Sequence, residues 1–251
     1  MIYKTEKNYW QQDIRKREYL RIFAEGAGLV LILSYVFYGT FLGAILLSPI
    51  LIGYFRMKKA ELIKKKQSLF QLQFKDAIQS ISAALNVGYS VENAMKEAFS
   101  ELRLLYKEDD KIIKEFSHMI HQMDMNVTME QALNEFAFRT QDEEVQTFVT
   151  VFSMAKRSGG DMIRIIQNAI HRISERTELL REMEALVSAK KMEFRIMSVI
   201  PIGMLLYISI SFPEFVKVLY GNMLGVVFMS ICLVIYIATY LLGKKIVDVE
   251  V

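Results

Sequence analysis

Three long uncharged runs constrain this chain more than any other feature of its sequence. No charged residue occurs in residues 26–55, 196–212 or 219–243. A helix needs about 20 predominantly apolar residues to cross the hydrocarbon core of a bilayer. Runs of these lengths predict an integral membrane protein. Because 24% of the 251 residues are nevertheless charged, a substantial part of the chain must lie outside the membrane.

The first run, residues 26–55, is too long for one upright helix and short for two. It could form two short helices that turn near Gly39 and Gly43, or one tilted helix. Basic residues flank the run on both sides, and cationic flanks stay in the cytoplasm. The flanks favour the hairpin, with residues 1–25 as a basic, amphipathic cytoplasmic segment. Acidic residues reduce the net positive charge of the first flank, so a single tilted helix remains an alternative. The basic residues that follow the run include Lys58, Lys59, Lys64, Lys65 and Lys66.

The second and third runs predict two transmembrane helices within residues 196–243, joined by a short outer turn. Lys190 and Lys191 precede them, and a cytoplasmic tail of residues 244–251 follows. Pro201, in the first turns of its helix, can kink it where neighbouring helices satisfy the freed carbonyl. Lysines beside membrane segments mark topology and contact anionic lipid, so we expect no nucleic acid.

Between the membrane segments, residues 56–195 show apolar residues at spacings of three and four. The pattern predicts helices near residues 67–86, 90–105, 109–124, 128–138, 142–157 and 161–195. Six helices can bury a core of their own. The expected fold is therefore all-α: an integral membrane protein with a six-helix cytoplasmic bundle between an N-terminal and a C-terminal pair of transmembrane helices.

One short sequence motif, which we call the repeated phrase, occurs in two similar copies in this region. NVGYSVENAMKEAF, residues 86–99, is echoed by NVTMEQALNEFAF, residues 126–138. Gly88 and Asn126 tolerate the left-handed conformation that ends a preceding helix. Ser90 and Thr128 stand two residues later as helix N-caps. Each copy therefore predicts a helix, a tight reversal and a second helix.

A third reversal precedes the longest predicted helix. Gly159 and Gly160 are expected to end one helix, and Asp161 is expected to cap the next. From residue 162 to residue 200 there is neither proline nor glycine. The sequence therefore predicts one continuous helix that runs from the cytoplasm into the bilayer.

No catalytic, cofactor or metal site is expected. The chain has no phosphate-binding loop of either common glycine-rich type, and its single cysteine, Cys232, cannot form a disulfide within the chain. Glu115, His118 and His121 stand at helical spacings that could place metal ligands on one face. A second copy of that motif is missing, so a solvated helix face is the favoured interpretation.

The order of these segments resembles the type II secretion system F domain family, over residues 67–240. The resemblance rests on three stretches that occur in the family's order: LQFKDAIQSISAALNVGYSVENAMKEA, TMEQALNEFAFRTQDEEVQTFVTVFSMAKRSGGDMIRIIQNAIHRISER and SVIPIG. The family's glycine and hydroxyl pattern maps onto Gly88 and Ser90, and its glycine pair maps onto Gly159 and Gly160. Asn126 departs from the second glycine of the family. The resemblance implies a non-enzymatic platform in the cytoplasmic membrane, multi-pass, with its main domain in the cytoplasm.

The resemblance also implies partners. A hexameric secretion ATPase would dock beneath the cytoplasmic domain, and pilin subunits would leave the bilayer beside the membrane helices. One F domain between two membrane pairs is similar to the Tad (tight adherence) type, whose platform usually works with a paralogue. We therefore expect an oligomer with a paralogous platform protein or with a second copy, in contact with membrane lipids. Phe136 and Phe138 are expected to lie outside the core and would suit such a partner.

Two other classes stay open at this point. A membrane-anchored helical scaffold or sensor without catalytic activity should carry an extracytoplasmic domain or an output module, and the sequence shows neither. A small transporter should carry ionisable residues inside its spans, and the three runs have none.

Overall fold

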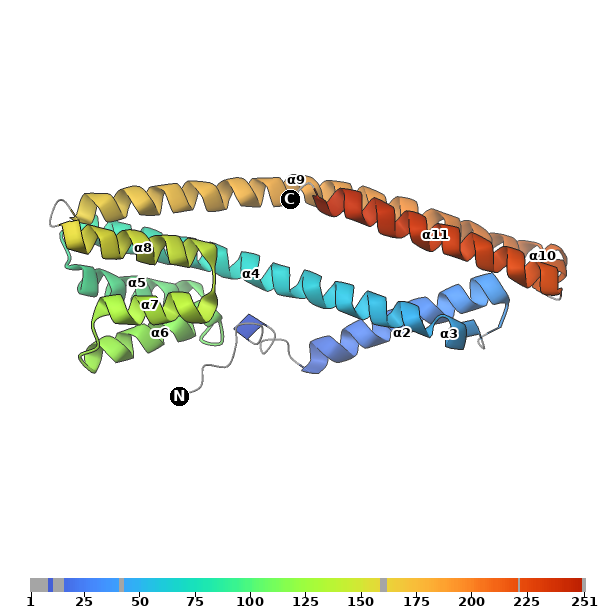
Figure 1. Cartoon of the computed structure of the whole chain (residues 1–251), viewed down its shortest axis with the longest axis horizontal. Coiled ribbons are helices and arrows are strands. Elements are labelled where there is room, and N and C mark those ends of the chain that lie inside the picture. The colour runs from blue at the N-terminus through green and yellow to red at the C-terminus, as the bar shows by residue number, and fades with distance from the viewer. Residues whose placement is uncertain (1–8, 11–15, 41–42, 159–161, 221, 250–251) are drawn as a thin grey trace. The chain divides into compact units, whose positions relative to one another are not determined.

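The computed structural model describes residues 9–10, 16–40, 43–158, 162–220 and 222–249, and every element within these ranges is a helix (Figure 1). The chain divides into two compact units. Unit 1 comprises residues 1–14 and 62–180, and unit 2 comprises residues 15–61 and 181–251. The helices are α2 (Lys16–Tyr38), α3 (Gly43–Leu46), α4 (Ser48–Asn86), α5 (Val91–Leu105), α6 (Lys111–Asp124), α7 (Met129–Thr140), α8 (Glu143–Ser158), α9 (Met162–Ser211), α10 (Pro213–Tyr220) and α11 (Met223–Val249).

Helices α5 to α8 lie within a few residues of the ranges predicted from the pattern of apolar residues. Helix α4 differs, because it begins at Ser48 and not near residue 67. No glycine or proline interrupts residues 54–86, and most of these residues are good helix formers. One helix of 39 residues therefore contains both the end of the first uncharged run and the first helix expected after it.

Helix α9 is continuous over 50 residues, as the absence of helix breakers predicts, and it includes Pro201. Proline lacks the N–H that would bond to the carbonyl of Met197, four residues earlier. The prediction of one helix that joins a charged stretch to an apolar one is confirmed, and the helix extends to Ser211.

The core of unit 1 is built around phenylalanine rings from α4, α6 and α7. The ring centroid of Phe136 on α7 lies 6.2 Å from the centroid of Phe70, 6.0 Å from that of Phe74 and 6.3 Å from that of Phe116. Phe136 is fully buried, whereas Phe138 is 53% exposed. The expectation that Phe136 lies outside the core was wrong, because two residues along a helix turn the side chain by about 200° and only one of the pair can face inward.

Unit 2 is a set of apolar helices. Helix α2 ends before Gly39, whose φ is +65°, and the chain turns through α3 into α4. The rings of Tyr19 on α2 and Phe55 on α4 stack with centroids 5.8 Å apart, so the two helices pack against each other. Four residues of α2 form a buried cluster with two of α11 (Val30, Leu33, Val36, Phe37, Met229 and Leu233).

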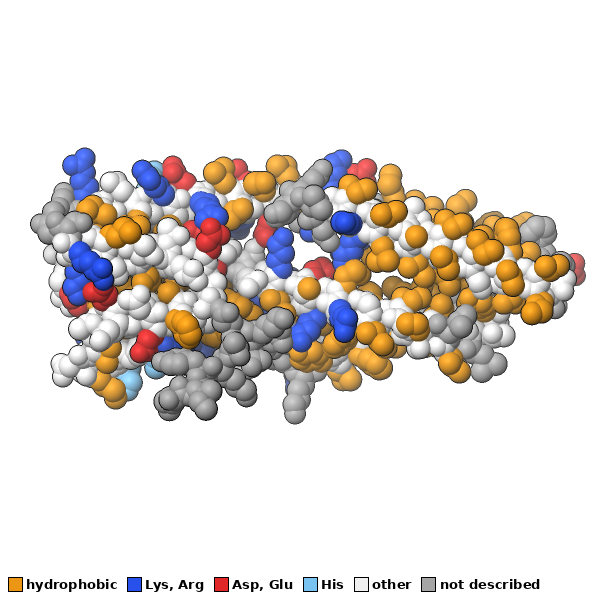
Figure 2. Space-filling view, in the orientation of Figure 1, with side chains coloured by type: hydrophobic (Ala, Val, Ile, Leu, Met, Phe, Trp, Pro, Cys, Tyr) orange, Lys and Arg blue, Asp and Glu red, His pale blue; other side chains and the backbone are white. Residues whose placement is uncertain are grey.

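Three of the described helices are long and apolar enough to cross a membrane: residues 17–38 of α2, 163–211 of α9 and 223–247 of α11. Large apolar side chains on α9 and α11 are exposed, among them Met204 at 63% and Phe228 at 60%. Figure 2 shows hydrophobic side chains spread over this face of unit 2. Such exposure suits contact with lipid and not with water.

Candidate interaction sites

The two copies of the repeated phrase form matching turns in unit 1. Gly88 has a φ of +95°, and Ser90 Oγ then accepts the backbone N–H of Asn93 at 3.3 Å. Asn126 has a φ of +65°, and Thr128 Oγ1 accepts the backbone N–H of Gln131 at 3.3 Å. Each turn therefore consists of a left-handed residue followed two positions later by a helix N-cap.

The two turns lie at the same end of unit 1. Lys96, near the start of α5, forms an ion pair of 2.9 Å with Asp124, the last residue of α6. Exposed apolar side chains stand beside both turns: Val87 is 79% exposed and Met125 is 63% exposed. An apolar surface at the end of a helical domain, which we call the turn surface (Val87, Tyr89 and Met125), suits contact with another protein.

The remaining predicted positions are distributed between the units. Gly159, Gly160 and Asp161 lie outside the described residues, between the end of α8 and the start of α9. Lys58 pairs with Glu61 at 3.1 Å, and Lys190 pairs with Glu193 at 3.2 Å. The other predicted lysines also lie on these two helices: Lys59, Lys64, Lys65 and Lys66 on α4, and Lys191 on α9.

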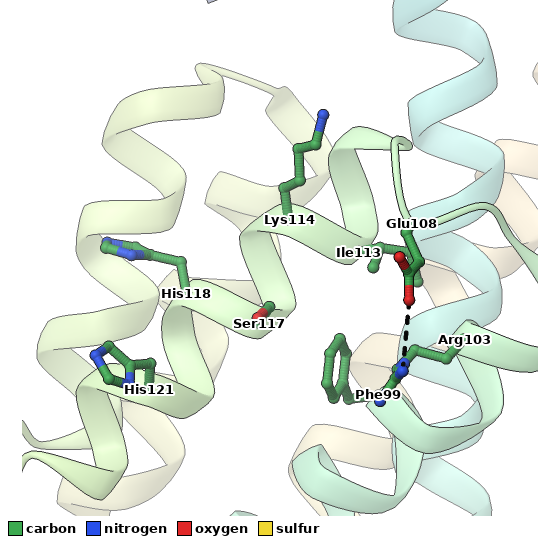
Figure 3. A pocket seen from close by; sticks show the side chains of 8 residues that line it. All are labelled: Phe99, Arg103, Glu108, Ile113, Lys114, Ser117, His118 and His121. Carbon is green, nitrogen blue, oxygen red and sulfur yellow. Dashed lines mark ion pairs between the residues drawn. The ribbon is translucent and has the colours of Figure 1, made fainter.

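A groove of about 560 Å³ lies between α5 and α6 (Figure 3). Its lining residues are Phe99, Arg103, Glu108, Ile113, Lys114, Ser117, His118 and His121. Arg103 forms an ion pair of 3.6 Å with Glu108, from the loop between the helices. The two basic side chains of the groove are both paired with acidic residues, because Lys114 likewise pairs with Asp109 at 3.5 Å. The charge of the groove therefore favours no particular class of ligand.

The suspected metal-binding face of α6 is divided by the structure. His118 and His121 line the groove, whereas the carboxylate of Glu115 is bound by Arg139 at 2.7 Å. Glu115 also accepts a hydrogen bond from the Tyr9 hydroxyl at 2.9 Å. Among the described residues no group of three histidine, cysteine or acidic side chains could hold a metal ion.

Buried acidic residues at the start of α8 were not expected from the sequence. Asp142 Oδ1 accepts the backbone N–H groups of Glu144 and Val145, at 3.0 and 3.3 Å, and Asp142 Oδ2 accepts from Gln71 at 3.0 Å. Burial raises the pKa of Asp142 above its ordinary value of 3.8, although these hydrogen bonds act in the opposite direction. The pKa of Glu144 is also raised, because the effect of burial exceeds the opposing effect of the Arg176 guanidinium 3.2 Å away.

Tyr9 and Trp10 were also missed. Trp10 is the only tryptophan of the chain and is 8% exposed in the core of unit 1. The available signal was a pair of adjacent aromatic residues in an otherwise polar segment. Its meaning depends on partners more than 100 residues away, because Tyr9 contacts Glu115 and Trp10 contacts Thr140.

Comparison with known families finds a match. The family model of type II secretion system (T2SS), protein F, matches residues 77–210, which is more than half of the chain. The matched range begins in α4, includes α5 to α8 and ends one residue before the end of α9. No curated protein and no solved structure matches the chain.

Proposed function

The chain belongs to the type II secretion system protein F family, and on that premise we propose that it is the inner-membrane platform of a secretion or type IV-like pilus machine. The observation that carries the proposal is the extent of the match. Residues 77–210 include both the charged helices of unit 1 and the apolar end of α9. The family likeness thus covers a helical domain together with a candidate membrane span.

The finer assignment is a platform of the Tad type. The family model matches residues 77–210, and candidate membrane spans lie both before the charged helices of unit 1 and after them. One F domain between two membrane segments is the layout of that type. We further propose that the platform acts without catalysis of its own, and that a hexameric ATPase drives it while pilin subunits leave the bilayer beside unit 2.

The proposed topology places both ends of both membrane hairpins in the cytoplasm. In unit 2, the Tyr38 hydroxyl of α2 lies 3.1 Å from the Ser230 hydroxyl of α11. Charged residues resume at Glu25 on α2 and at Lys244 on α11, each about 20 Å from that contact along its own helix. The uncharged parts of the two helices therefore end at a similar depth, and this agreement supports a common cytoplasmic boundary.

The turn surface is the contact that we put forward for the ATPase. Its apolar side chains, Val87, Tyr89 and Met125, are exposed, and none of them belongs to the apolar core of unit 1. The proposed partner would cover them. Leu104, which is 87% exposed near the other end of α5, provides a matched position away from the two turns.

Co-purification tests both the function and the surface. The detergent-solubilised chain is incubated with the secretion ATPase and the pilin encoded by the same organism, as wild type, as a Val87→Asp/Met125→Asp variant and as a Leu104→Asp variant. We expect wild type and Leu104→Asp to retain the ATPase, and the double variant to lose it. All three should keep the same helical circular dichroism, because each substitution replaces an exposed side chain.

The outcomes separate the alternatives. Equal retention by all three variants would keep the platform function and reject the turn surface. No retention by folded wild-type protein would contradict coupling to the ATPase, and it would favour a membrane-anchored scaffold.

A further inference from the structure

Two aromatic residues near the amino terminus are docked on unit 1. The indole Nε1 of Trp10 donates a hydrogen bond to the carbonyl oxygen of Thr140 at 3.1 Å. The indole ring meets the ring of Phe70 edge to face, with centroids 5.3 Å apart. Trp10 thus lies between α4, which carries Phe70, and the last residue of α7.

Tyr9 is held by charged side chains. Its hydroxyl donates to Glu115 Oε1 at 2.9 Å, and its carbonyl oxygen accepts a hydrogen bond from Lys111 Nζ at 2.8 Å. The same ammonium group lies 3.7 Å from the centroid of the Tyr9 ring and 4.5 Å from that of Trp10. A cation at these distances is attracted to the faces of both rings. The site therefore recognises the backbone, the phenol and the two ring systems of a Tyr–Trp pair.

The walls of this site are held together by contacts of their own. Glu115 on α6 accepts hydrogen bonds from Arg139 on α7, at 2.7 Å from Nη2 and 3.1 Å from Nε. The rings of Phe70, Phe116 and Phe136 join α4, α6 and α7 in the core. None of these contacts involves Tyr9 or Trp10. Removal of the pair would leave the three helices joined, so the pair has the character of a bound ligand.

We propose that unit 1 carries a binding site for a Tyr–Trp peptide segment, occupied reversibly by residues 9 and 10 of the same chain. The tether keeps the effective concentration of the segment high, so the site is filled in the intact protein. Opening costs the contacts of two side chains, which places it among local opening events.

The intrinsic fluorescence of the full chain in detergent tests this proposal, because Trp10 is the only tryptophan. We expect the parent protein to show blue-shifted emission that acrylamide quenches poorly. Lys111→Met removes the cation and its hydrogen bond to Tyr9. This change should raise the quenching constant at least about threefold, with unchanged far-ultraviolet circular dichroism.

Lys114→Met is the matched control, because Lys114 lies one turn along α6 and is paired with Asp109 at 3.5 Å. It should behave as the parent does. Emission typical of an exposed indole in the parent, or equal quenching in the parent and Lys111→Met, would overturn the proposal.

Binding in trans gives an independent test. A fluorescein-labelled peptide of residues 3–14 is titrated into the Trp10→Ala chain and into the parent. Its anisotropy should rise saturably with Trp10→Ala, whose site lacks the indole, and much less with the parent. A peptide with alanine in place of the tryptophan should not bind. Equal binding to both chains, or none to a folded Trp10→Ala chain, would refute the proposal. If Trp10→Ala does not fold, the quenching of Lys111→Met alone decides.

Discussion

Residues with positive φ set the direction in which the chain leaves α4 and α6. Gly88 and Asn126 occupy corresponding places in the two copies of the repeated phrase, with φ of +95° and +65°. A side chain at Gly88 would meet no other atom within 4 Å, so space does not restrict this position. The backbone conformation does restrict it, because a Cβ on a residue in the left-handed region comes close to the following carbonyl oxygen. Asparagine tolerates this region better than other residues with a Cβ.

Gly88→Ala should therefore lower the free energy of unfolding of unit 1 by about 1–2 kcal/mol. Asn126→Gly should change it by less than about 0.5 kcal/mol, because glycine adopts the same φ without strain. Thermal unfolding in detergent, followed by the fluorescence of Trp10, measures both. Equal losses in the two variants would show that the left-handed conformation does not control these turns.

The buried acid at the start of α8 has a testable dependence on pH. The pKa of Asp142 is raised in the folded protein, so its contribution to stability is fully present below the ordinary value of 3.8 and is lost as pH rises through the folded value. Asp142→Asn removes this loss and still offers an oxygen to the N–H groups of α8. We expect the variant to gain stability relative to the parent as pH rises from 4 to 7.

Asp142→Ala is the comparison for that variant, because it also removes the helix cap. It should cost about 1 kcal/mol at pH 7. The measurement is the apparent melting temperature at several pH values. A constant difference between parent and Asp142→Asn across this range would contradict a raised pKa.

At the scale of the helix, features set by local sequence could be predicted, whereas features set by long-range packing could not. The turns at residues 86–90 and 125–128 could be predicted because a left-handed residue and a hydroxyl cap are local features. The start of α4 could not be predicted, because helix propensity continues across the change from apolar to charged residues near Arg56. Asp142 and Trp10 could not be found because their burial depends on residues 71 and 130 positions away.

The continuity of α9 makes it the element through which motion of the charged helices could reach the apolar ones. Two glycines inserted after Leu180, near Glu178, add flexibility without removing any side chain. We expect the variant to keep its helical circular dichroism and its binding of the ATPase, and to abolish pilus assembly in a complementation assay.

The same insertion between Lys107 and Glu108, in the loop that joins α5 to α6, is the control and should leave assembly intact. Assembly that survives the α9 insertion would exclude a stiff helix as the coupling element.

At the scale of the whole molecule, the arrangement in the membrane is the property that follows most directly from charge. The hairpin of α2 and α4 has short uncharged arms, and the eight residues from Ser48 to Phe55 span about 12 Å. This is less than half of the hydrocarbon core, so the arm from α4 is not itself a candidate span. The contact between Tyr38 and Ser230 nevertheless places the tip of the hairpin beside α11 within unit 2.

Cysteine labelling determines whether this tip reaches the outer surface. Cys232 is first replaced by serine, and single cysteines are then introduced as Thr40→Cys, Asn222→Cys and Lys245→Cys. We expect a membrane-impermeant maleimide to label the first two in intact spheroplasts and the third only after permeabilisation. If Thr40→Cys is protected while Asn222→Cys is labelled, the hairpin enters the bilayer and turns back within it.

The contact between Trp10 and Thr140 also constrains how the chain is made. The two residues are 130 positions apart, and ribosomes add about 5–20 residues per second. For about 6–26 seconds after Trp10 is synthesised, the complete site that receives it does not yet exist. During that time α2 can form while the preceding aromatic residues are not yet docked. Secure docking of the amino terminus is therefore among the last steps of biogenesis, and a large amino-terminal fusion should delay it.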